Sequence, residues 1–211
     1  MLSDNLPGFI GGGFNFSAAS PHIQAIDAEL TEARTLLSLP AASPLPIGVG
    51  FLLFSPTGFT DHLLPILFTH RVSAIWLSFP HTNADQAPII AAIRKLREEQ
   101  DWTVKIFVQV GTVDAAREAV RQGADVVVAQ GTDAGGHQIK VGAGVVALVP
   151  EVRDMVDKEG NGEVAVVAAG GLVDGRGVVA ALGLGMSAPQ TKQKTLRNFT
   201  FFCVQLPKVQ K

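Results

Sequence analysis

Residues 104–130 read VKIFVQVGTVDAAREAVRQGADVVVAQ, which places an amphipathic segment between two short apolar runs. The runs, at 104–110 and 125–129, are rich in β-branched residues and nearly continuous in apolar side chains, a pattern typical of strands that are buried on both faces. Between them, Thr112 can cap a helix and Gly123 can end it. The stretch therefore predicts two parallel strands joined by a helical crossover.

The same alternation continues through most of the chain. Further apolar runs of this kind lie at 47–54, 72–79 and 164–169. Further helices are expected to begin near residues that favour helix N-termini, namely Ser20-Pro21, Asn83, Pro150 and Asp174. This alternation predicts an α/β fold with parallel strands, either a (β/α) barrel or an open doubly wound sheet.

A glycine fingerprint after the first strand usually marks the open doubly wound sheet. The letters of Gly142-Ala-Gly144-Val-Val-Ala147 match this fingerprint, but the preceding GGHQIKV is not a buried strand. We therefore expect no dinucleotide site at these glycines.

The composition bounds the class of protein. The chain has 211 residues, 47% of them hydrophobic, and a formal net charge of −2, which predicts a folded chain with a sizeable core. A pI of about 6.2 gives no basic footprint, so we expect no nucleic acid as partner. The single cysteine, Cys203, excludes an internal disulfide framework, and the scattered histidines lack metal-ligand spacing, so no metal site is expected.

The two ends of the chain differ from its centre. Residues 1–13 carry Asp4 where a signal peptide needs positive charge, and no unbroken apolar run of about 18 residues follows, so we expect a cytoplasmic protein with no membrane partner. Residues 186–211 contain five Lys or Arg and no acid. We predict one domain over residues 1–185 and a poorly packed basic tail over 186–211; a docking arm for an acidic partner or a membrane surface is the alternative.

Two glycine-rich segments follow buried strands and are candidate sites. In VVVAQGTDAGGHQ (126–138), the strand leads into Gln130, a loop with Gly135, and His137. Ligands of α/β folds bind at this end of the strands, glycines admit a ligand close to the backbone, and a histidine can exchange a proton there. The alternative is a turn whose histidine only bonds a neighbour.

The second segment is VAVVAAGGLVDGRG (164–177), in which a strand ends at Gly170-Gly171 and a helix follows. Amide groups at such a turn can cradle a phosphate, aided by the helix dipole. The alternative is a tight turn with no ligand.

These segments resemble one known family. QGTDAGGH at 130–137, preceded by FVQVGTVDAAREAVRQGADVVV and followed by AAGGLVDGRGVVAALGLG at 168–185, is similar to the nitronate monooxygenases, once called 2-nitropropane dioxygenases. The resemblance covers roughly residues 45–185. GGFNFS at 12–17 resembles the family's early glycine turn.

The resemblance implies a TIM-type (β/α) barrel that binds FMN and oxidises alkyl nitronates with O2. In this family pattern His137 is the catalytic base, Gln130 and Gly135 contact the flavin, and Gly170 and Gly171 bind its phosphate. The related flavin-dependent enoyl reductases are one alternative, and a degenerate, non-catalytic barrel fragment is another.

Three departures from the family pattern predict an incomplete barrel. The family's first strand, which ends in Ala-Pro-Met, has no counterpart before residue 8, and Gly50 stands where an asparagine usually faces the flavin. After residue 185 the family's next strand and its glycine-threonine turn are replaced by SAPQTKQKTLRNFTFF. We therefore expect both ends of the barrel to be missing or replaced.

Overall fold

The computed structural model describes residues 8–159 and 163–187. This part of the chain forms two compact units. The N-terminal unit holds residues 8–109 and 118–126, and the C-terminal unit holds residues 110–117, 127–159 and 163–187. The predicted tail beyond residue 187, including Cys203, lies outside the described residues.

The strands of the N-terminal unit are parallel and follow one another in chain order. They are β1 (Gly8–Gly11), β2 (Leu45–Leu52), β3 (Val72–Ser78) and β4 (Lys105–Val110). Each pairs with the next: Ile10 lies opposite Val49, Gly50 opposite Trp76, and Trp76 opposite Phe107. The runs predicted at 47–54, 72–79 and 104–110 are thereby confirmed as strands.

The strand β1 was not among the strands predicted from the sequence. The four residues of β1 read GFIG and pair with β2 from Gly8 to Gly11. Such a short segment with a glycine at each end has no apolar run to reveal it. Pairing with β2, which supplies the hydrogen-bond partners, is what makes it a strand.

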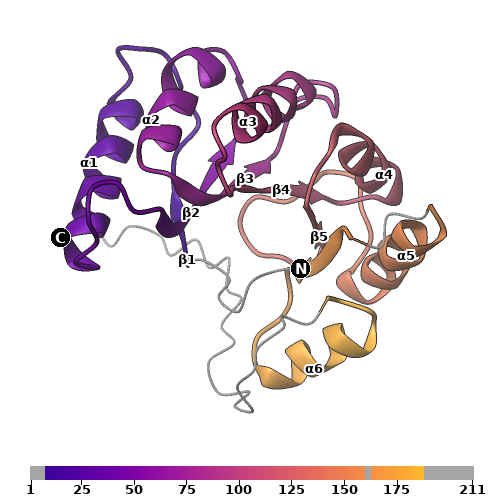
Figure 1. Cartoon of the computed structure of the whole chain (residues 1–211). Helices are drawn as coiled ribbons and strands as arrows, with labels where there is room; N and C mark the ends of the chain where they lie inside the picture. The colour runs from indigo at the N-terminus through magenta and orange to yellow at the C-terminus, as the bar shows by residue number, and fades with distance from the viewer. Residues whose placement is uncertain (1–7, 160–162, 188–211) are drawn as a thin grey trace. The chain divides into compact units, whose positions relative to one another are not determined.

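Helices pack on one face of these strands, as Figure 1 shows for α1, α2 and α3. They are α1 (Pro21–Leu36), the short π-helix η1 (Phe59–Leu63) with α2 (Leu64–Thr69), and α3 (Ala87–Glu99). The predicted start of α1 is confirmed, because the side chain of Ser20 accepts a hydrogen bond from the backbone N–H of His22 at 3.2 Å. The fully buried rings of Phe16, Phe51 and Phe59 pack edge to face in the core.

The opposite face of the strands carries its own aromatic cluster. The ring of Phe9 lies 5.2 Å from the rings of both Trp76 and Phe107. An added Cβ at Gly48 would lie 2.3 Å from the Phe9 ring, so only glycine leaves room for it. This packing ties the short β1 to the strands that follow it.

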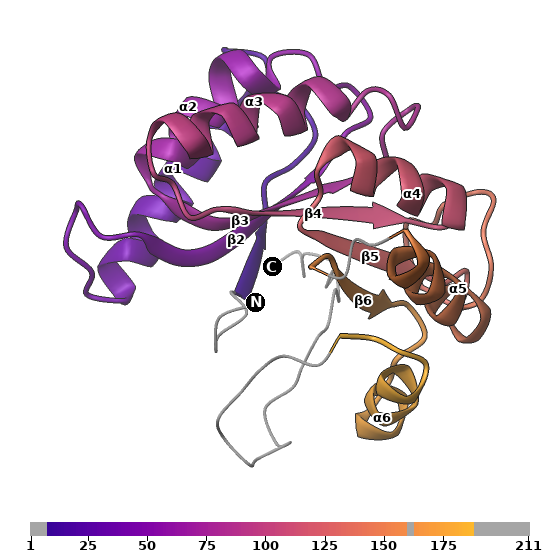
Figure 2. The same ribbon diagram turned by 45° about the vertical axis from the view of Figure 1, so that its right-hand side comes forward.

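The C-terminal unit repeats the strand–helix pattern. It contains β5 (Val126–Gln130), α5 (Val145–Lys158), β6 (Ala165–Ala169) and α6 (Gly175–Gly183), visible together in Figure 2. After α6 the chain returns to β6, where Ser187 N–H donates to Val166 O at 2.8 Å. The predicted strands at 125–129 and 164–169 and the predicted start of α6 at Asp174 are confirmed.

The strand order separates the two architectures left open by the sequence. The hydrogen-bonded order is β1-β2-β3-β4-β5-β6. A doubly wound sheet reverses its order at a switch point, whereas a (β/α) barrel keeps chain order. The helix α4 (Val113–Gln122) is the crossover between β4 and β5, as predicted. The order begins at β1 and ends at β6, so within the described residues the sheet is that of an incomplete TIM-type barrel.

Two predicted helix starts are wrong. Asn83 lies in a turn in which Thr82 N–H donates to the Asp85 carboxylate at 2.7 Å, and α3 begins at Ala87, with Pro88 in its first turn. Pro150 lies inside α5 rather than at its start. The helix begins five residues earlier because a distant carboxylate caps it, as described below.

Candidate functional site

The loop after β5 carries three of the predicted site residues, Gln130, Gly135 and His137. Gln130 is the last residue of β5, and its side-chain N–H donates to the backbone carbonyl of His137 at 3.1 Å. A second side chain, Gln138, donates to the carbonyl of Ala134. These two bonds fold the glycine-rich segment back onto the end of the strand.

Gln130 also presents an acceptor that the described residues do not satisfy. Its Oε1 is buried and has no hydrogen-bond partner among them. A buried polar atom without a partner costs roughly 1–3 kcal/mol. Such an atom at the end of a strand is a natural contact for a ligand N–H.

Gly135 and His137 lie on the exposed part of this loop. An added Cβ at Gly135 would meet no atom within 4 Å, so packing does not require glycine there. The neighbouring Gly136 has a φ of 72°, which does favour glycine. The loop therefore has open space beside its backbone.

Asp133, which the sequence analysis did not single out, caps α5. Its carboxylate accepts a hydrogen bond from the backbone N–H of Val145, the first residue of the helix, at 2.7 Å. Nearby, Thr132 N–H donates to Ala143 O at 3.0 Å. Gly144 at the N-cap has no side chain to do this work, so the helix uses an acceptor from twelve residues earlier.

The glycine pair after β6 packs directly on this loop. Gly170 and Gly171 have φ of 87° and 72°. An added Cβ at Gly170 would lie 2.8 Å from the Cβ of Ala134, and one at Gly171 would lie 2.8 Å from the Cβ of Asp133. The structure thus brings the two predicted segments together, and their close approach alone already requires both glycines.

A carboxylate occupies the start of α6. The side chain of Asp174 accepts from the backbone N–H of Arg176 at 2.9 Å and pairs with its guanidinium at 2.6 Å. These bonds, first the one from the Arg176 side chain, lower the pKa of the exposed Asp174 carboxyl. The Arg176 amide is therefore engaged by a protein carboxylate.

In the N-terminal unit, Gln109 lies near the carboxyl end of β4. It is buried, and its Oε1 accepts from the indole N–H of Trp76 at 3.1 Å. Gln109 was not among the predicted site residues. The feature that could have marked it in the sequence is a polar residue within a buried apolar run. Gly50, which was expected where the family pattern has an asparagine, accepts from Gly12 N–H at 2.8 Å through its backbone carbonyl.

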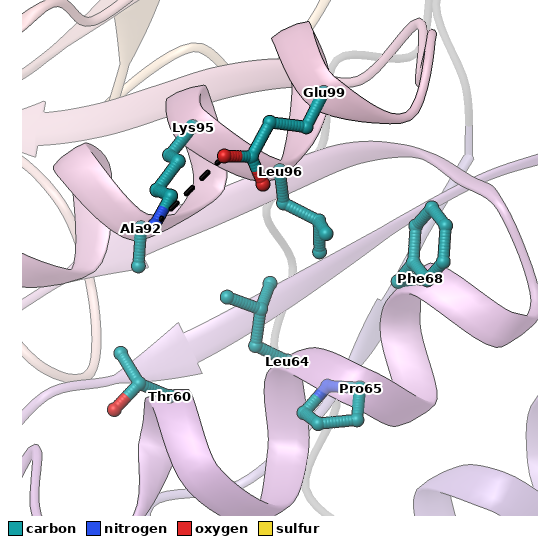
Figure 3. A pocket seen from close by; sticks show the side chains of 8 residues that line it. All are labelled: Thr60, Leu64, Pro65, Phe68, Ala92, Lys95, Leu96 and Glu99. Carbon is teal, nitrogen blue, oxygen red and sulfur yellow. Dashed lines mark ion pairs between the residues drawn. The ribbon is translucent and has the colours of Figure 1, made fainter.

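A surface pocket of about 380 Å³ lies elsewhere in the N-terminal unit, between the helices (Figure 3). Leu64 and Phe68 of α2 and Leu96 of α3 give it an apolar lining. Lys95 and Glu99 at its edge are 3.8 Å apart. It contains none of the predicted site residues.

Among the described residues, no three His, Cys, Asp or Glu side chains gather as a metal site. No helix in residues 8–159 or 163–187 is both long and apolar enough to cross a bilayer.

Curated relatives share the sequence over most of this chain. A nitronate monooxygenase of Neurospora crassa is 49% identical over 189 residues, which cover 84% of this chain and 50% of that protein. Nitronate monooxygenase npaC of Metarhizium robertsii is 38% identical over 82% of this chain and 49% of that protein. The chain thus spans about half the length of the curated relatives it matches.

Solved structures share the fold. A mutant of FabK from Thermotoga maritima superposes with a TM-score of 0.58 at 28% identity, covering 89% of this chain and 60% of that one. A nitroalkane oxidase from Streptomyces ansochromogenes gives a TM-score of 0.60 at 23% identity, covering 85% and 56%. The second likeness is one of fold alone.

The family model described as nitronate monooxygenase matches residues 85–195, more than half of the chain and including both glycine-rich segments. Together with the two curated relatives, this match shows that the chain belongs to the nitronate monooxygenase family.

Proposed function

We propose that this chain binds FMN at the β5 and β6 loops and takes part in the oxidation of alkyl nitronates by O2, with His137 as the catalytic base. The observation that carries the proposal is the packing of the Gly170-Gly171 turn on the Gln130–His137 loop. Both segments of the family's pattern thereby meet at the carboxyl ends of adjacent strands. This is the end at which (β/α) barrels bind their ligands.

The residues present fit a flavin. The buried, unpartnered Oε1 of Gln130 would accept a hydrogen bond from an N–H of the ring, which removes the cost of leaving that atom unsatisfied. Gly135 has open space where its Cβ would be, so a flat ring could approach the backbone there. The amides of Gly170 and Gly171 would donate to the phosphate.

FMN and the residues around it would have separate roles in the reaction. When bound, FMN supplies the electron chemistry. The imidazole of His137 would accept the α-proton of a neutral nitroalkane, or donate a hydrogen bond to the anionic nitronate. Gln130 would hold the backbone of His137 in place through the bond to its carbonyl.

The first experiment is the visible absorption spectrum of the purified full chain before and after FMN addition and gel filtration. Retained flavin absorbance, together with O2 uptake on adding propyl nitronate, is the expected result. A colourless protein that loses added FMN on the column would overturn the proposal and leave the non-catalytic barrel fragment. NADH or NADPH oxidation with an enoyl thioester, without turnover of propyl nitronate, would instead identify an enoyl reductase.

The base is tested by His137→Ala. With a neutral nitroalkane as substrate, we expect turnover to fall by about 10²–10⁴-fold, the usual contribution of a general base, with FMN affinity unchanged. His62→Ala is the matched control, because His62 is a histidine of the short helix η1 and is not among the predicted site residues. Equal turnover in the two variants would remove His137 from the mechanism.

A further inference from the structure

We infer that Asp133 is a positioning residue of this site: by capping α5 it holds the Gln130–His137 loop and the Gly170-Gly171 turn in one arrangement. The inference rests on the proposed function for what the arrangement is used for. It concerns a residue that would touch neither the proton nor the flavin.

The carboxylate of Asp133 contacts the start of α5. The carboxylate lies 2.7 Å from the N–H of Val145. An added Cβ at Gly144 would lie 3.1 Å from the nearer carboxylate oxygen, so the N-cap position must stay small for the carboxylate to reach the helix. An anionic acceptor at this end also complements the helix dipole.

Asp133 also lies against the Gly170-Gly171 turn. The Cβ of Asp133 lies 2.8 Å from the position that a Cβ on Gly171 would take. The backbone of the same loop contacts Gly170 as well, at the carbonyl of Gly131. Asp133 therefore joins three segments, the β5 loop, the start of α5 and the β6 turn.

The consequence concerns the two bonds that shape the rest of the loop. Gln130 bonds the carbonyl of His137, and Gln138 bonds the carbonyl of Ala134, the neighbour of Asp133. Without the Asp133 carboxylate, the loop keeps its bond from Thr132 N–H to Ala143 O, but the segment that these two bonds close is held less firmly against α5. His137 would then be less firmly fixed relative to the glycine turn, whereas Gln130 stays beside it through the bond from Gly131 N–H to Ala169 O.

The contact between Asp133 and Val145 also explains why the start of α5 is rich in glycine. The letters of Gly142–Ala147 match a nucleotide fingerprint, yet the amide that would meet a phosphate there, that of Val145, is bonded to Asp133. A protein carboxylate thus fills the anion position of this helix. The glycine at 144 serves Asp133 rather than a ligand.

The test compares Asp133→Ala and Asp133→Asn with Ser20→Ala, which removes the N-cap of α1 in the N-terminal unit. Amide hydrogen exchange is followed at Val145 and over residues 130–138. Losing a cap typically costs enough for about a fivefold loss of protection. We expect that loss at Val145 and throughout the loop in D133A, and protection near that of the unchanged protein in D133N, because an amide oxygen can still accept. S20A should lose protection only in α1.

FMN titration of the same variants is the second readout. D133A should raise the FMN dissociation constant on the order of tenfold through lost preorganisation, while S20A leaves it unchanged. If no protein in the set binds FMN, the proposed function fails, and hydrogen exchange still decides the role of Asp133. Loop exchange in D133A equal to that in S20A, or in D133N equal to that in D133A, would overturn the inference.

Discussion

Gly171 must be a glycine both for its backbone conformation and because Asp133 lies close to it. Its φ of 72° is strained for other residues, and an added Cβ would lie 2.8 Å from the Cβ of Asp133. We expect Gly171→Ala to lower the free energy of unfolding by about 1–3 kcal/mol, measured by chemical denaturation. Gly183→Ala is the control: this glycine ends α6, an added Cβ meets no atom within 4 Å, and the change should stabilise by roughly 0.4–1 kcal/mol. Equal effects of the two changes would show that the approach to Asp133 is not restrictive.

The helix α6 depends on a carboxylate cap, and this makes its stability depend on pH. The Arg176 side chain and backbone hold the pKa of Asp174 below its ordinary value of 3.8. A carboxyl whose pKa is lower in the folded than in the unfolded state stabilises the fold above the unfolded pKa, and this contribution is lost as pH falls through the folded value. Asp174→Ala should therefore be less stable than the unchanged protein at pH 6 by more than at pH 3, in denaturant unfolding. Asp154→Ala, which removes an exposed carboxylate 3.9 Å from Lys158, is the control. A stability difference for D174A that is the same at both pH values would contradict the prediction.

The two compact units of the chain share elements of secondary structure, which bears on whether they unfold together. The helix α4 contributes residues to both, since residues 113–117 belong to the C-terminal unit and residues 118–122 to the N-terminal one. The chain also crosses between them within β4 and within β5. Because shared elements cannot fold twice independently, we expect one cooperative transition, as the single predicted domain over residues 1–185 requires. Trp76 and Trp102, the two tryptophans, both lie in the N-terminal unit, so their fluorescence should change at the same denaturant concentration as far-UV circular dichroism, which reports on both units. Two separated midpoints would contradict this.

Local sequence was sufficient for most of the strands and for the family. β-Branched apolar runs are buried wherever they occur in an α/β fold, so each of the five predicted runs lies at a strand. Ser20 and Asp174 cap helices through bonds to residues two positions ahead, which a reader of the sequence can anticipate. The motifs around Gln130 and Gly170 pointed to the family that the comparisons show.

Contacts between distant residues decided the remainder. The strand β1 exists through its pairing with β2, and α5 begins where Asp133 reaches it rather than at Pro150. The close approach of Gly171 to Asp133 likewise joins residues that are far apart in the chain. The local sequence determines which residues are buried and which residues cap a helix one or two turns away in the chain. An acceptor twelve residues away, or a strand of four residues, is selected by the free energy of the packed fold, which depends on which segments become neighbours.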